Sequence, residues 1–138
     1  MGEGILLDTC AMIWMAHEEP FSIKAREKVV RVRKSGGIIA VSAMSAWEIG
    51  MLIARGKLPT TKSARLWFRD FTTFGRVTVD EATPDILIAS SFLPKPVHND
   101  PTDRIIIATA RQHDLTIITR DRAILAYGAA GHVKTMAC

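Results

Sequence analysis

The sequence predicts a three-layer α/β/α sandwich built around a mainly parallel sheet of about five strands. Two observations predict this fold class. Short runs rich in β-branched residues alternate with longer stretches of helical periodicity along the chain. The short runs are also apolar on both faces, which is typical of parallel strands covered by helices. Alternating strands and helices indicate βαβ units, whose crossovers are expected to be right-handed.

The expected elements follow one another without a linker or an internal repeat. The strands are expected at 4–7, 38–41, 77–79, 116–119 and 132–135. The helices are expected between them at 10–17, 22–35, 43–55, 61–73, 83–91 and 101–113, with a further short helix from Arg122. Ser22 is a good N-cap for the second helix. Asp100-Pro101 marks the start of the sixth, because proline is favoured at the first helical position.

The composition indicates a globular protein with one domain over residues 1–138. The chain has 48% hydrophobic and 23% charged residues, and its 138 residues are enough for an independent core. Its apolar runs fall far short of the ~18 residues that a membrane span needs. No signal-peptide pattern follows Met1, so we expect a cytoplasmic protein without a membrane partner. The net charge of +4 is compatible with a polyanionic partner but does not establish one.

Four acidic residues lie near the expected carboxyl ends of strands. Asp8 directly follows the first strand, and Asp121 follows the fourth by two residues. Asp103 lies in the first turn of the helix that leads into the fourth strand, and Glu48 lies early in the helix after the second. In open α/β sheets the functional crevice lies at the carboxyl ends of the strands. We therefore predict that Asp8, Glu48, Asp103 and Asp121 form one site.

Each of these acids also has a structural explanation. Asp8 and Asp121 would be suitable N-caps for the helices that follow them. Asp100 is the better cap within Asp-Pro-Thr-Asp. Asp103 would then either favour the helix dipole from the third helical position or face a cation. Asp100 is then a supporting residue.

The position of Glu48 depends on which serine caps its helix. Glu48 follows Ser45 by three residues, which matches a capping box. Ser42 would cap the same helix equally well. Glu48 would then lie further into the helix in apolar company, where a carboxylate needs a partner.

The chemistry of such a cluster points to a metal-dependent nuclease. Crowded carboxylates repel one another unless a cation neutralises them. Oxygen ligands suit Mg²⁺ or Mn²⁺, which can polarise a phosphodiester and orient an attacking water. No nucleophile elbow, P-loop or dinucleotide fingerprint is present, which excludes those enzyme classes. His98 lies nearest to the predicted site, and we expect it to be part of the loop structure rather than a substrate contact.

Four segments carry a resemblance to a known family. They are Leu6-Leu7-Asp8-Thr9-Cys10, Ser45-Ala46-Trp47-Glu48-Ile49, His98-Asn99-Asp100-Pro101-Thr102-Asp103-Arg104 and Ile117-Ile118-Thr119-Arg120-Asp121. Together they resemble the PIN-domain family, and most closely its VapC-like toxins of bacterial toxin–antitoxin pairs. Cys10 and Thr102 depart from the residues often found in this pattern, but neither position supplies a carboxylate.

The resemblance implies a Mg²⁺- or Mn²⁺-dependent endoribonuclease. Asp8 and Asp103 would be the principal metal ligands. Glu48 and Asp121 would complete the site directly or through water, and Thr119 would supply a hydroxyl beside the last aspartate. The resemblance also implies a homodimer, a cognate antitoxin whose tail covers the site, and a structured RNA such as tRNA or rRNA as substrate.

RNA binding would need cations around this acidic site. Candidate RNA-binding residues are Arg55, Lys57, Lys62, Arg65 and Arg69, the last three at helical spacing. A merely solvated face explains the same stripe. Arg104 beside Asp103 is a supporting residue or one half of a structural ion pair. Trp67 and Phe68 are candidates for an exposed dimer contact.

Two other functions are compatible with parts of the pattern. A receiver-like phosphoacceptor also clusters acids at strand ends, but it would need paired acids after the first strand and a lysine after the last. Here Asp8 stands alone, and Lys134 lies within the last expected strand. A non-catalytic PIN-like module that binds RNA or protein is the second alternative, and the presence of all four acids argues against it.

Overall fold

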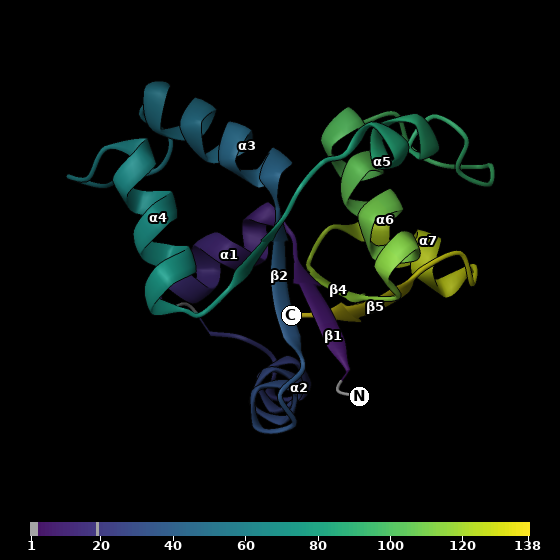
Figure 1. Cartoon of the computed structure of the whole chain (residues 1–138), viewed down its shortest axis with the longest axis horizontal. Coiled ribbons are helices and arrows are strands. Elements are labelled where there is room, and N and C mark those ends of the chain that lie inside the picture. Colours follow the sequence, from purple (N-terminus) through teal and green to yellow (C-terminus); the bar gives the residue numbers. More distant parts are fainter. Residues whose placement is uncertain (1–2, 19) are drawn as a thin grey trace.

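The computed structural model describes residues 3–18 and 20–138. Its centre is a sheet of five parallel strands in the order β3-β2-β1-β4-β5 (Figure 1). The strands are β1 (Gly4–Leu7), β2 (Ile38–Ser42), β3 (Thr78–Asp80), β4 (Thr116–Thr119) and β5 (Lys134–Ala137). This confirms the predicted parallel sheet of five strands.

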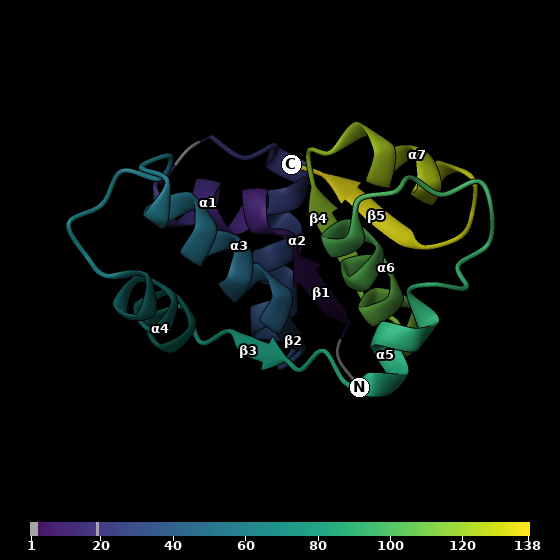
Figure 2. The ribbon, with the colours of Figure 1, turned by 90° about the horizontal axis from the view of Figure 1, so that it is seen from above.

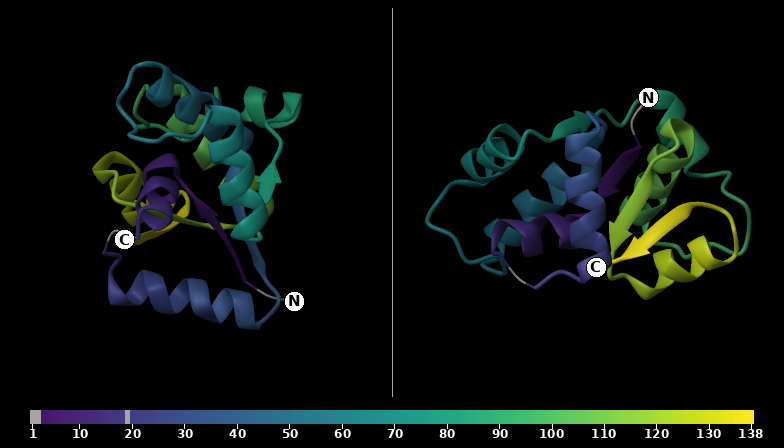
Figure 3. Two further views of the ribbon diagram at one scale, coloured as in Figure 1. Left: turned by 90° about the vertical axis from the view of Figure 1, so that its left-hand side faces the viewer. Right: turned by 90° about the horizontal axis from the view of Figure 1, so that it is seen from below.

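Helices cover both faces of this sheet (Figures 2 and 3). They are α1 (Thr9–Ala16), α2 (Ile23–Lys34), α3 (Ala43–Ala54), α4 (Ala64–Phe74), α5 (Pro84–Ala89), α6 (Pro101–His113) and α7 (Arg122–Ala129). Helices α1 to α4 connect strands in one direction across the sheet, and α5 to α7 connect them in the other. Right-handed crossovers in opposite directions place their helices on opposite faces, which gives the predicted three layers.

Each face of the sheet has its own hydrophobic core. Ile5, Leu7 and Val41 pack on one face with side chains of α1 to α4. Leu6 and Ile117 pack on the other face with α5, α6 and α7. Successive residues of a strand point to opposite faces, so these short strands are buried on both sides. Within the described residues, no helix combines the length and apolarity that crossing a membrane requires.

Some predicted boundaries shift because local contacts override the apolar pattern. The last strand begins at Lys134 instead of residue 132, because His132 belongs to the turn after α7, where its backbone N–H donates to the Tyr127 carbonyl. The fourth helix begins at Ala64 instead of residue 61, because Ser63 caps it by accepting from Leu66 N. Lys62 therefore precedes this helix, and the predicted three-residue helical stripe loses its first member.

Candidate metal centre

The strand order places two of the predicted acids side by side. Strands β1 and β4 are neighbours, and the connections that leave them run to opposite sides of the sheet. Such a reversal is the topological switch point where α/β sheets form a crevice. Asp8 follows β1 and Asp121 is the second residue after β4, so both lie at this point.

Asp8 uses both carboxylate oxygens within the fold. Its Oδ1 accepts a hydrogen bond from Ala11 N at 2.7 Å and thereby caps α1. Its Oδ2 accepts from the Thr119 hydroxyl, whose oxygen in turn accepts from Asp121 N at 2.9 Å. Thr119 is fully buried. The buried hydroxyl thus joins the ends of β1 and β4 and holds the two aspartates in register.

Asp121 and Asp100 also cap helices. Asp121 Oδ1 accepts from Ile124 N at 3.0 Å at the start of α7. Asp100 Oδ1 accepts from Asp103 N at 3.1 Å at the start of α6. The structural explanation predicted for these residues is therefore present. A capping carboxylate has a second oxygen, however, so a cap does not exclude a role at the site.

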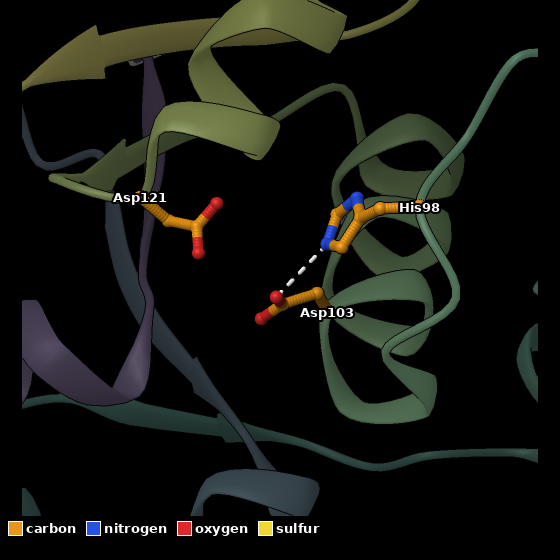
Figure 4. A group of neighbouring side chains, drawn as sticks. All are labelled: His98, Asp103 and Asp121. Carbon is orange, nitrogen blue, oxygen red and sulfur yellow. Dashed lines mark hydrogen bonds and ion pairs between the residues drawn. The ribbon is translucent and has the colours of Figure 1, made fainter.

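Asp103 projects from the first turn of α6 toward the end of β4. Its Oδ2 lies 2.9 Å from His98 Nε2, in the loop before α6. One ligand atom from each of His98, Asp103 and Asp121 lies within 4.8 Å of the other two, and Figure 4 shows these side chains facing one another. Sequence reasoning assigned His98 to loop structure. Its position five residues before Asp103 was the available signal, but the loop's path decides where its ring points.

Glu48 reaches the site from the second turn of α3. Ser42 caps this helix, so Glu48 does not occupy a capping-box position. The Thr9 hydroxyl donates to Glu48 Oε1, and Ser45 Oγ lies 2.9 Å from the same hydroxyl oxygen. The Thr9 hydroxyl is thus the partner that a carboxylate at this position was expected to need; of its neighbours along the helix, Ile49 is buried and Trp47 is 57% exposed. Trp47 lies on the face of α3 that is exposed to solvent.

Burial and mutual repulsion raise the pKa values of three of these carboxyls. Burial raises the pKa of Asp8 to about 6, against the opposing hydrogen bonds from Thr119 and Ala11, and Asp103 and Asp121 add repulsion. Burial also raises the pKa of Glu48 and of Asp103, with the Thr9 and His98 hydrogen bonds opposing. Each carboxylate is thus destabilised in its charged form by its surroundings.

The residues at this edge fit a divalent cation. The donor set consists of carboxylate oxygens with one imidazole nitrogen at the rim. A cation between them would offset the repulsion and desolvation that raise their pKa values. Carboxylate ligands that leave positions for water and phosphate are typical of Mg²⁺ and Mn²⁺ sites.

The predicted basic residues do not gather around these acids. Arg104 donates from Nε to the His98 carbonyl at 2.8 Å and from Nη2 to Asn99 Oδ1 at 3.3 Å. Within residues 3–18 and 20–138 it forms no ion pair, so of its two predicted roles the structural ion pair is wrong, and its side chain instead ties the loop before α6 to that helix.

The other predicted RNA-binding residues lie beyond α3. Arg55 caps α3, Lys57 is exposed in the following loop, and Arg65 and Arg69 are exposed on α4. Helix α4 lies at the outer end of the molecule, with α1 and α3 between it and α6 (Figures 1 and 2). Lys62 pairs with Asp70 at 2.9 Å. The charge of Lys62 is therefore partly neutralised.

The candidate dimer residues on α4 face inward. Trp67 is 7% exposed and stacks on Phe71, and Phe68 packs against the same core. The prediction that these rings are exposed is wrong, because α4 packs against α3 and turns its apolar face toward the core on this side of the sheet. The exposed large apolar side chains lie elsewhere and include Trp47, Ile88 and Phe92.

Comparisons with known proteins connect this chain to one family. The family model described as PIN domain matches residues 5–129. The chain is 26% identical to Ribonuclease VapC22 of Mycobacterium tuberculosis over 121 residues. The aligned region covers 87% of this chain and 88% of that protein.

Solved structures share the fold. VapBC2 from Rickettsia felis, bound to a DNA fragment from its promoter, matches with a TM-score of 0.70 at 12% identity, over 97% of this chain and 98% of that chain. A toxin–antitoxin complex from Klebsiella pneumoniae matches with a TM-score of 0.56 at 20% identity, over 87% of this chain and 89% of that chain. These similarities confirm the predicted α/β/α architecture.

Proposed function

Because the chain belongs to the PIN domain family, we propose that it is a Mg²⁺- or Mn²⁺-dependent endoribonuclease with Asp8, Glu48, Asp103 and Asp121 at its active site. The observation that carries this proposal is the convergence of acids from four distant segments at the β1/β4 switch point, with raised pKa values in three of them. Similarity to a protein named as a ribonuclease supports it. We treat residues 1–138 as one catalytic domain.

The four acids and Thr119 would have different roles in this reaction. Asp8 and Asp103 would be the principal metal ligands, with Glu48 and Asp121 completing the site directly or through water. When bound, the cation would neutralise charge on the scissile phosphate and make a nearby water easier to deprotonate. Thr119 would position Asp8 by the hydrogen bond that it donates. Glu48, held by Thr9, would accept a proton from an attacking water.

We further propose that the protein is the toxin of a toxin–antitoxin pair in the cytoplasm. Its structural neighbours include toxin–antitoxin complexes, which supports an antitoxin partner. The homodimer that the family resemblance implies is part of the same proposal. Exposed apolar side chains such as Ile88 and Phe92 offer contact area for protein partners. The substrate would be a structured RNA such as tRNA or rRNA, bound with help from Arg55, Lys57, Arg65 and Arg69.

The decisive experiment measures metal-dependent cleavage of labelled total RNA by the full chain freed of any antitoxin. We expect cleavage with Mn²⁺ or Mg²⁺ and none with EDTA. Asp103→Asn should reduce the rate by about 10²-fold or more, because it removes an anionic ligand that would hold the ion stabilising the transition state. Asp85→Asn, an exposed residue in the first turn of α5, is the matched control for loss of one acidic charge.

The outcomes separate the candidate functions. Equal cleavage by wild type and Asp103→Asn would overturn the site assignment. If folded wild type cleaves no RNA with or without metal but still binds RNA or protein, the non-catalytic module would be favoured instead. Acid-stable labelling by a phosphodonor would favour a receiver-like domain. Lys134, which such a domain would need at the site, instead pairs with Asp114 at 2.9 Å.

A further inference from the structure

We propose that His98 supplies a nitrogen ligand to the metal centre, so that the site favours transition-metal ions such as Mn²⁺ and Co²⁺ over Mg²⁺. The inference rests on the proposed metal-dependent function and adds the class of ion that the site selects. It assigns His98 a role that the four acidic residues alone do not require.

The spacing of the ligand atoms carries this proposal. In an octahedral site with bonds of about 2.1 Å, two adjacent ligand atoms lie about 3 Å apart and two opposite ones about 4.2 Å apart. His98 Nε2 lies 2.9 Å from Asp103 Oδ2, which corresponds to an adjacent pair. Atoms of His98, Asp103 and Asp121 lie within 4.8 Å of one another. An ion between the three would therefore reach all of them with small side-chain shifts.

The loop that carries His98 is fixed by several contacts. Arg104 donates to the His98 carbonyl and to the Asn99 side chain, so the backbone of this loop is tied to α6. Asp100 then caps the same helix. The His98 side chain is 24% exposed and that of Asp103 19% exposed, so a hydrated ion can approach both. Figure 4 shows the His98 ring pointing from the loop toward Asp103 and Asp121.

A nitrogen ligand changes which ions a carboxylate site prefers. Mg²⁺ is a hard ion that selects oxygen ligands, whereas affinity for mixed nitrogen and oxygen sites rises along the first-row transition metals. An imidazole at the rim of an otherwise acidic site therefore lowers the affinity for Mg²⁺ relative to the affinities for Mn²⁺ and Co²⁺. Asp8 and Glu48 would still supply the negative charge that any divalent ion needs.

His98→Gln separates ligation from hydrogen bonding. A glutamine side chain can place an N–H near Asp103 Oδ2, so it can keep a hydrogen bond there, but it has no imidazole nitrogen to donate to a metal. If His98 only orients Asp103, the substitution should leave the order of metal affinities unchanged. His113→Gln is the matched control, because His113 pairs with Asp80 near the other end of α6, about 15 Å along that helix.

The test is a pulsed electron-spin-echo measurement of ¹⁴N coupling on Mn²⁺ bound to the full chain, together with calorimetric titrations of Mn²⁺, Co²⁺ and Mg²⁺. We expect ¹⁴N coupling in wild type and in His113→Gln and its loss in His98→Gln. The Co²⁺/Mg²⁺ affinity ratio should fall by roughly tenfold in His98→Gln. Neither readout depends on RNA cleavage.

The possible failures are distinguishable. Mn²⁺ that binds wild type and is lost in Asp103→Asn, but shows no ¹⁴N coupling and an unchanged ion order in His98→Gln, would overturn the nitrogen ligand and leave the proposed nuclease intact. No binding of any of the three ions by folded wild type would overturn both proposals. A coupling that persists in His98→Gln and disappears in His113→Gln would assign the nitrogen to the wrong histidine and overturn the inference.

Discussion

Three carboxyl groups at this edge of the sheet cap helices and still keep acceptor capacity for a ligand. Asp8, Asp100 and Asp121 each cap a helix with one oxygen. The two oxygens of a carboxylate together offer about four lone-pair sites, so a cap leaves room for a metal even at Asp8, whose second oxygen also accepts from Thr119. The capping hydrogen bond also fixes the side-chain rotamer and therefore the direction in which the second carboxylate oxygen points. At the residue scale, a capping role therefore does not exclude metal binding.

Asp8 is predicted to destabilise the metal-free protein at neutral pH. Its pKa is about 6 in the fold against 3.8 ordinarily, so between these values the folded state holds a proton that the unfolded chain has released. The contribution of Asp8 to the free energy of unfolding therefore falls as the pH rises from about 3.8 to about 6. In EDTA at pH 7, Asp8→Asn should be more stable than wild type by about 1–3 kcal/mol.

Urea denaturation across pH 4 to 7 would measure this effect. The gain from Asp8→Asn should shrink toward zero at the acidic end, where both folded proteins carry a neutral group. A difference that stays constant across the range would contradict the assignment of the raised pKa to Asp8.

At the scale of elements, the packing of α7 on β5 depends on a residue without a side chain. A Cβ at Gly128 would lie 2.3 Å from Thr135 Oγ1 and 3.0 Å from Thr135 Cβ. The stiff β-branched side chain of Thr135 has little freedom to move away. Because Asp121 caps the start of α7, the packing of this helix on β5 also influences the position of Asp121 relative to the sheet.

Gly128→Ala should lower the free energy of unfolding by about 1–3 kcal/mol, because α7 must shift away from β5. Gly50→Ala is the matched control, since Gly50 lies inside α3 and a Cβ there meets no atom within 4 Å. That change should stabilise by about 0.5–1 kcal/mol through helix propensity. Thermal unfolding of both variants measures the contrast. A similar gain in both would show that α7 does not pack as closely as described.

At the scale of the whole molecule, the parallel sheet brings together segments that are remote in the sequence. The hydrogen bond from Thr119 to Asp8 joins residues 111 apart, and that from Thr9 to Glu48 joins residues 39 apart. The site therefore exists only in the folded chain. A ligand that binds this site must stabilise the fold as a whole.

Mn²⁺ at 100 times its Kd should raise the free energy of unfolding by about 2.7 kcal/mol. EDTA should reverse the effect, and Asp103→Asn should abolish it, whereas Asp85→Asn should retain it. Calorimetric unfolding at several Mn²⁺ concentrations provides the measurement. An equal stabilisation of Asp103→Asn would indicate that the ion binds elsewhere on the protein.

The sequence by itself determined the element order, the parallel sheet, the helix caps and the four acids at strand ends. These follow from local patterns, namely apolar periodicity, capping residues and the position of an acid after a strand. Sequence alone did not give the environment of each side chain. It placed Trp67 outside, which was wrong, and it predicted that Glu48 needs a partner without identifying Thr9 as that partner.

Only the tertiary structure decided which side chains meet. It turned His98 toward Asp103, assigned Arg104 to the loop backbone and paired Lys62 with Asp70. These contacts depend on the path of loops and on the rotation of helices about their axes. Packing between distant segments fixes both, and no local pattern records that packing.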